Sequence, residues 1–283
     1  MKSKQMLWCI AVVTAMLFLA CIITACSVQI NLDSNEKDSQ DNASSLSENA
    51  VEKIDAQEDG FVTKDGVRFY YANGELQVDT IVGNDTDGYF YADKSGAINT
   101  GCCNGITIGD TDWIVIEGEA YRVRTESDKC LFAAAKDIAA CTTVDMSREE
   151  KLKASFDYIK SHYLEGTPHN PPYPYTSMDW PIVCANDLFV NGKGDCYSYG
   201  AAFAYYARAI GYTEVYACNS GGHGWAEIEN RTYDPEWSLH SSKYTYYGMS
   251  YDDECDVLYA KSIADEEDYK RLMIEIHSEF TAS

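Results

Sequence analysis

The spacing of hydrophobic and polar residues divides the chain into segments of different character. An apolar run from about Met6 to Ile23 comes first, and the segment 27–59 that follows is rich in Asp, Glu, Ser, Asn and Gln. Residues 60–125 then show short alternating or aromatic runs punctuated by turn residues, a pattern typical of β-hairpins. Beyond this module the apolar positions recur at helical spacing, and short strand-like runs follow further along the chain. This combination predicts a second domain of mixed helices and strands over 126–283.

Two aromatic segments of the hairpin module have related sequences. Lys64–Gly74 (KDGVRFYYANG) and Asp87–Gly96 (DGYFYADKSG) each place an Asp-Gly turn before an aromatic strand, which indicates a repeat. The pair resembles the aromatic hairpin repeats of choline-binding and glucan-binding surface proteins, and that resemblance implies carbohydrate recognition. The alternative, which we favour, is that the aromatic side chains pack against each other or against the next domain.

Two helices and a proline-rich crossover are expected next. The Ala-rich segment Leu131–Cys141 predicts one helix, and the capping box Ser147–Glu150 opens another. One face of that second helix carries the apolar residues Leu152, Phe156, Ile159 and Tyr163. Consecutive prolines then interrupt regular structure over 169–175 (HNPPYPY), as one wall of a substrate cleft or as a plain surface crossover.

The most informative segment is 192–212 (GKGDCYSYGAAFAYYARAIGY), which predicts a glycine loop, a buried helix and a glycine stop. Asp195 is the expected N-cap, and Gly211 occupies the position where a left-handed residue ends a helix. Cys196 therefore falls in the first helical turn. There the positive end of the helix dipole stabilises a thiolate, and unpaired backbone N–H groups can bind an oxyanion.

Three short strands are predicted after this helix. Glu214–Cys218 and His223–Glu229 form an antiparallel pair, and Thr232–Pro235 is expected to add a third strand. His223 and Asp234 then lie on neighbouring strands with their side chains on one face. A carboxylate that binds one imidazole nitrogen fixes the tautomer and supports the imidazolium that forms when the other nitrogen takes a thiol proton.

Gly-Asp-Cys at a helix start, His-x-Trp on a strand and Asp-Pro on the next strand together resemble the transglutaminase-like superfamily. The resemblance covers roughly Met146 to Trp237. It implies an α+β fold with a papain/transglutaminase-like core, in which the cysteine-bearing helix packs on an antiparallel sheet. It also implies that Cys196 is the nucleophile, His223 the base and Asp234 the residue that orients the base.

Two further residues take supporting roles by the same resemblance. Trp225 stands beside the histidine, and Asp195 precedes the cysteine. Animal transglutaminases carry Gln in place of Asp195, and the Asp form is similar to the bacterial branch, which includes peptidases. A side-chain donor to the oxyanion is not defined by the sequence, with Trp180 and Asn186 as the two candidates.

The N-terminus has the layout of a secretion signal. Lys2 and Lys4 precede the apolar run, and Ile23-Thr24-Ala25-Cys26 resembles the lipobox of bacterial lipoproteins. The resemblance implies that residues 1–26 are a signal peptide, that Cys26 is lipidated, and that the protein is anchored on the outer face of the bacterial cell membrane. Residues 27–59 are then a disordered tether. The alternative is an uncleaved membrane anchor.

Charge and cysteine content bear on the partners, disulfides and cofactors that are expected. A net charge of -23 argues against a nucleic-acid partner. If Cys196 stays a free thiol, an odd number of cysteines remains after the signal segment, so the disulfide pairing is undefined. Adjacent Cys102 and Cys103 raise the question of zinc, but no CxxC pair or histidine cluster supports it, so neither a metal nor an organic cofactor is expected.

The sequence therefore predicts an exported lipoprotein whose thiol attacks an amide carbonyl of a protein or peptide, possibly a cell-wall peptide, and forms a thioester acyl-enzyme. Water as acceptor makes the protein a cysteine peptidase or amidase, whereas an amine makes it a protein-glutamine acyltransferase. We favour hydrolysis, because a surface enzyme meets water at high concentration. The alternative is a catalytically inactive lipoprotein that binds the cell wall or acts as an adhesin. The oligomeric state is not defined by the sequence.

Overall fold

The computed structural model describes residues 59–169, 174–251 and 270–276. They belong to the second of two units into which the chain divides, Lys53–Ser283. The expected signal peptide, the lipidation site Cys26 and nearly all of the tether lie outside the described residues. Among the described helices, none has the length and apolar character that crossing a membrane requires.

Residues 60–125 fold into antiparallel β-structure, as predicted. The three-stranded sheet has the order β1-β2-β3, and the five-stranded sheet has the order β4-β5-β8-β7-β6. The bounds of these strands are β1 Gly60–Lys64, β2 Val67–Ala72, β3 Glu75–Leu76, β4 Thr80–Asn84, β5 Gly88–Ala92, β6 Asn104–Ile108, β7 Thr111–Ile116 and β8 Glu119–Arg122. The two related segments occupy equivalent places, because an Asp-Gly turn leads into β2 in one and into β5 in the other.

Aromatic side chains of the hairpin module pack against each other. The ring of Phe61 meets Tyr70 and Phe90 edge to face, with centroids 4.8 and 5.4 Å apart. The guanidinium of Arg68 lies 3.7 Å from the Phe61 ring centroid and 4.3 Å from that of Phe90. These contacts support the packing interpretation of the aromatic repeats.

The rest of the described chain combines helices with a second five-stranded antiparallel sheet, so the predicted α+β class is confirmed. The helices are α2 Glu126–Cys141, α3 Arg148–His162, α4 Trp180–Phe189, α5 Cys196–Ile210 and α6 Pro235–His240, with a 3-10 turn η1 at Pro174–Thr176. The sheet has the order β14-β13-β12-β11-β15. Its strands are β11 Val215–Asn219, β12 Gly224–Ile228, β13 Arg231–Tyr233, β14 Tyr247–Met249 and β15 Lys270–Met273, and β9 Leu164–Glu165 pairs in parallel with β10 Lys193–Gly194.

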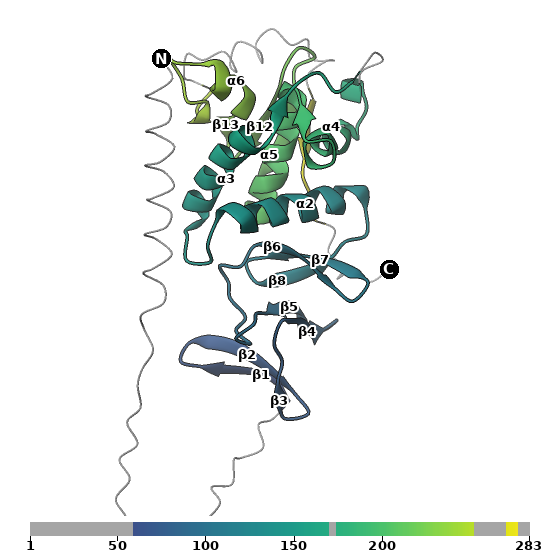
Figure 1. Cartoon of the computed structure of the whole chain (residues 1–283), viewed down its shortest axis with the longest axis vertical. Coiled ribbons are helices and arrows are strands. Elements are labelled where there is room, and N and C mark those ends of the chain that lie inside the picture. The colour runs from purple at the N-terminus through teal and green to yellow at the C-terminus, as the bar shows by residue number, and fades with distance from the viewer. Residues whose placement is uncertain (1–58, 170–173, 252–269, 277–283) are drawn as a thin grey trace, which may run out of the picture. The chain divides into compact units, whose positions relative to one another are not determined.

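Helix α5 is the centre of the core. Nearly all of its residues are buried, and it packs on β11 and β12 and against α2, α3 and α4 (Figure 1). Small alanines at many of its positions let the surrounding elements approach closely. Ile114 and Ile116 of β7 belong to the same core cluster. The core therefore continues across the predicted boundary at residue 125, where Thr125 is the N-cap of α2.

Three local predictions differ from the structure. Asp234 was expected on a strand, but it follows β13 and caps α6, because proline lacks an N–H and fits the first helical position. Tyr163 ends α3 as its C-cap. Helix α4 was not predicted, since its short apolar run carries no N-terminal side-chain cap.

Candidate active site

Cys196 is the first residue of α5 and is half-buried. The predicted N-cap is confirmed, because Oδ1 of Asp195 accepts the N–H groups of Tyr197 at 3.1 Å and Ser198 at 3.3 Å. At the other end, Gly211 adopts φ 112° as the C-cap. Since Asp195 satisfies the next two N–H groups, the N–H of Cys196 is the first-turn donor that no described acceptor binds.

The segment around η1 covers the first turn of α5. The Tyr175 hydroxyl donates to Oδ2 of Asp195 at 2.6 Å, and its ring stacks on Tyr197 with centroids 3.6 Å apart. Asn219 Nδ2 donates to the Tyr175 carbonyl at 2.8 Å. The end of the proline-rich crossover therefore lies against the residue that follows Cys196, which favours the cleft-wall interpretation.

His223 and Asp234 meet at the same end of two neighbouring inner strands of the sheet. His223 immediately precedes β12, and Asp234 immediately follows its antiparallel neighbour β13. His223 Nε2 lies 2.5 Å from Asp234 Oδ2, and both residues are buried. The other oxygen of Asp234 accepts the N–H of Trp237 at 3.0 Å, so both carboxylate oxygens are fixed.

The imidazole of His223 lies near enough to Cys196 for the two side chains to interact electrostatically. Burial by itself lowers the pKa of His223, but the charge of Asp234 and hydrogen bonds with Asp234 and with the Cys196 sulfur outweigh it and raise the pKa well above its usual range. Because Nε2 is bound to Asp234, Nδ1 is the ring nitrogen left for the thiol. The three residues singled out from the sequence are thus brought together in the order sulfur, imidazole, carboxylate.

Two tryptophan rings lie nearly parallel to the imidazole ring of His223. Trp237 stacks on His223 with centroids 3.7 Å apart and an interplanar angle of 13°. Trp225, the support residue expected from the sequence, is fully buried and lies nearly parallel to the same ring at 6.2 Å. Trp237 was missed as a site residue, although its place three positions after an Asp-Pro helix start puts it in the first turn of α6, beside the cap.

Two glycines allow the segments that carry Cys196 and His223 to approach each other. A Cβ atom at Gly224 would lie 2.7 Å from Cα of Tyr197, and one at Gly200 would lie 2.7 Å from N and Cα of Trp225. Both contacts involve backbone atoms, which cannot rotate away. The first turns of α5 and the start of β12 therefore pack backbone to backbone, and this places Cys196 beside His223.

The two candidate oxyanion donors have different surroundings. Asn186 accepts from the Cys130 thiol at 3.5 Å and so faces α2. Trp180 is fully buried, its ring meets that of Tyr197 edge to face at 6.1 Å, and no described residue accepts its indole N–H. A buried donor without an acceptor is costly, and a developing negative charge nearby would satisfy it.

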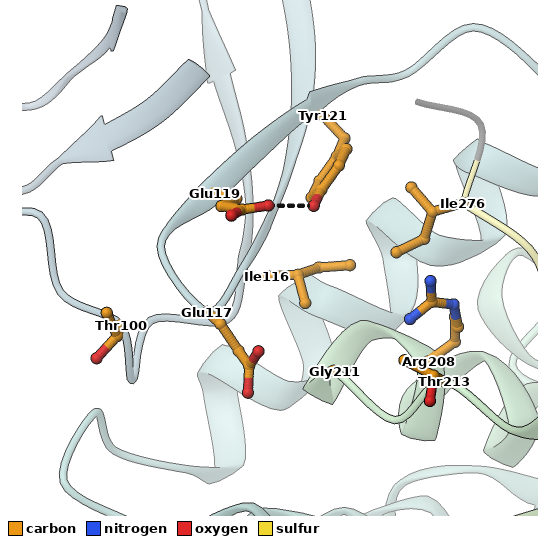
Figure 2. A pocket seen from close by; sticks show the side chains of 9 residues that line it. All are labelled: Thr100, Ile116, Glu117, Glu119, Tyr121, Arg208, Gly211, Thr213 and Ile276. Atoms are coloured by element: carbon orange, nitrogen blue, oxygen red, sulfur yellow. Dashed lines mark hydrogen bonds between the residues drawn. The ribbon is translucent and has the colours of Figure 1, made fainter. Parts of the chain in front are cut away.

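A cavity of about 540 Å³ lies at the opposite end of α5 (Figure 2). Arg208 and Gly211 at the end of the helix line it together with Glu117, Glu119 and Tyr121, and the Tyr121 hydroxyl donates to Glu119 at 2.5 Å. A helix of this length separates the cavity from the nucleophile by roughly 20 Å. The cavity is therefore remote from Cys196.

Several other thiols of the described chain are buried. Burial raises the pKa of each of five other thiols, Cys102, Cys103, Cys130, Cys141 and Cys184.

A comparison with family models, curated proteins and solved structures found no match for the chain. The geometry described above is therefore the basis for assigning function.

Proposed function

We propose that this chain is a transglutaminase-like cysteine enzyme that acts on amide bonds of proteins or peptides at the bacterial cell surface. The observation that carries the proposal is the placement of Cys196 at a helix N-terminus near His223, whose imidazole is bound to Asp234. The cysteine-bearing helix packed on an antiparallel sheet supports a transglutaminase-like core. The lipobox-like segment before Cys26 supports export and lipid anchoring.

The first half-reaction uses the imidazolium that Asp234 stabilises. The Cys196 thiolate attacks the amide carbonyl, so a carbon–sulfur bond forms while the carbonyl π electrons move to oxygen. The backbone N–H of Cys196 donates to that oxyanion. When the carbon–nitrogen bond breaks, protonated His223 gives its proton to the leaving nitrogen, which leaves a thioester and a neutral imidazole.

The acceptor in the second half-reaction determines whether the enzyme is a hydrolase or an acyltransferase. Neutral His223 takes a proton from water or from an amine as that molecule attacks the thioester, and the carbon–sulfur bond breaks to release the thiolate. We propose hydrolysis as the main reaction, because water is abundant at an exposed surface. The amine route uses the same residues and becomes protein-glutamine acyl transfer.

Space for a substrate lies beside the triad. Trp237, Lys243 and Tyr246 line a hollow of about 350 Å³, and Trp237 stacks directly on His223. The lining also includes His240 and two serines, so aromatic and polar groups are both available to a peptide side chain next to the scissile bond.

The test is competitive labelling of the mature, reduced protein with limiting iodoacetamide at pH 6.5, mapped by mass spectrometry. Cys196 should label far ahead of the partly exposed thiols Cys102 and Cys141, which are the matched internal controls. His223→Ala should remove that advantage, because the imidazolium that stabilises the thiolate is gone. Equal labelling of the three thiols, or full reactivity of Cys196 without His223, contradicts the proposal.

A second assay separates the two acceptors. Peptide amides bearing a chromogenic leaving group report acylation by the first burst of product. The carboxylic acid product indicates hydrolysis, whereas a new amide formed with added lysine analogues indicates acyl transfer. Cys196→Ala is the blank for both readouts.

A further inference from the structure

A second group of nucleophilic and titratable side chains lies outside the triad. His169 Nε2 is 2.7 Å from Oδ2 of Asp187, and the donor atoms of His169, Cys184 and Asp187 all lie within 4.8 Å of one another. Cys184 and Asp187 are three residues apart on α4 and so share one face of the helix. His169 comes from the segment after β9, a distant part of the sequence.

The group forms a cage that is closed on the protein side. Cys184 is fully buried, and the side chain of Asp187 is 3% exposed, whereas that of His169 is 24% exposed. Within the described part of the chain, the Cys184 thiol has no hydrogen-bond partner. The imidazole is thus the side of the cage that reaches solvent, and it offers an entry path.

The hydroxyl of Ser198 binds the Asp187 carboxylate and helps to fix its position. Ser198 Oγ donates to Oδ2 of Asp187 at 3.0 Å and lies 3.3 Å from Oδ1 of Asp195, the N-cap beside Cys196. Groups that hold a ligating carboxylate in place are a regular part of protein metal sites.

We propose that His169 Nε2, Cys184 Sγ and an Asp187 carboxylate oxygen bind a zinc ion. A mixed nitrogen, sulfur and oxygen donor set suits Zn²⁺, whereas Ca²⁺ and Mg²⁺ require oxygen ligands. Three protein ligands leave a fourth, tetrahedral position for water on the exposed side of His169. As the zinc–sulfur bond forms, the thiol releases its proton to solvent, and the imidazole binds in its neutral form.

The proposed ion ties two separate segments together. His169 lies at the start of the proline-rich crossover, whereas Cys184 and Asp187 belong to α4, which packs on α5. Zinc binding would therefore link the start of the crossover to α4, which packs on α5, the helix that begins at Cys196. The expected consequence is greater stability of this region, because the ion binds the folded state alone.

A different cluster provides an internal comparison. Glu165, Glu236 and His240 also bring their donor atoms within 4.8 Å of one another, but the His240 side chain is 59% exposed. Their ion pairs account for that arrangement, and the cluster contains no thiol.

The test is titration of the reduced, full-length Cys196→Ala protein with Co²⁺ as a spectroscopic probe, followed by competition with Zn²⁺. Using this variant removes the triad thiol, so the result is independent of the proposed catalysis. We expect a one-to-one complex with a thiolate-to-cobalt charge-transfer band that Zn²⁺ displaces. Adding Cys184→Ser should abolish the band, and adding Ser198→Ala should weaken binding about tenfold.

Two further variants guard the interpretation. His169→Ala removes a partly exposed ligand with little risk to folding and should also abolish tight binding. Cys130→Ala is the matched control, because this buried thiol contacts Ile182 and Asn186 of the same helix α4 outside the cage, and it should leave the band intact. A band that persists in Cys184→Ser, equal loss in Cys130→Ala, or no saturable binding overturns the proposal.

Discussion

The close contact at Gly224 leads to a specific prediction about the distance between Cys196 and His223. In Gly224→Ala the new Cβ atom starts 2.7 Å from Cα of Tyr197, whereas an ordinary contact begins near 3.4 Å. The start of β12 and the first turn of α5 must therefore separate by about 0.7 Å or more. Gly224 adjoins His223, and Tyr197 adjoins Cys196, so this shift acts directly on the pair.

The magnitude follows from two effects. Forcing an extra methyl group into a packed site costs about 1–3 kcal/mol of folding free energy. A displacement near 1 Å between reacting groups costs about 100-fold in rate. Gly224→Ala should therefore remain largely folded while its Cys196 labelling rate at pH 6.5 falls toward that of His223→Ala.

Gly222→Ala is the control for this substitution. Gly222 lies in the same turn, has no atom within 4 Å of the position that an added Cβ would take, and does not adopt a left-handed backbone. Its labelling rate and urea midpoint should match those of the wild type. The reasoning is refuted if Gly224→Ala labels at the wild-type rate, or if the two variants lose reactivity equally.

Substitutions at three other positions give separate tests. Trp237→Leu removes the ring stacked on His223 and should slow Cys196 labelling by up to about tenfold, with Trp237→Phe close to wild type. Trp180→Phe should reduce substrate turnover about 100-fold and leave iodoacetamide labelling unchanged, because only acyl transfer develops an oxyanion. Burial and then the charge of Asp234 raise the pKa of Glu236 to about 7, so the folded state loses stability as pH rises between about 4.5 and 7. In urea titrations Glu236→Gln should therefore be stabilised by about 1–2 kcal/mol at pH 8 and little changed at pH 4.

The parts of the site that the sequence could predict are those set by local signals. An Asp before the first helical residue and a Gly after the last fix the ends of α5, and both assignments are confirmed. The order of cysteine, histidine and aspartate along helix and strands then places the triad residues near the same end of two neighbouring inner strands of the sheet. Each of these signals acts over a few residues, so no tertiary information was required.

The parts that could not be predicted depend on contacts between distant segments. His169 has no distinguishing neighbours in the sequence, yet the fold places its imidazole against buried Asp187. His169 begins the proline-rich crossover, whereas Asp187 lies beyond it on α4. Trp237 was missed for a related reason, because its contact with His223 exists only once β12 and β13 pair.

Two carboxylates set the geometry of the triad by the same local device. Asp195 caps α5 with one oxygen and binds the Tyr175 hydroxyl with the other, and Asp234 caps α6 with one oxygen and binds His223 with the other. Each cap therefore fixes a helix start and a neighbouring side chain at once. The remaining requirement is the position of the imidazole. The sheet sets that position, because the absence of a side chain at Gly224 lets the start of β12 pack against α5. A functional site built this way tolerates variation in the outer strands, whereas exchanging either aspartate for alanine removes a helix cap and a site contact together.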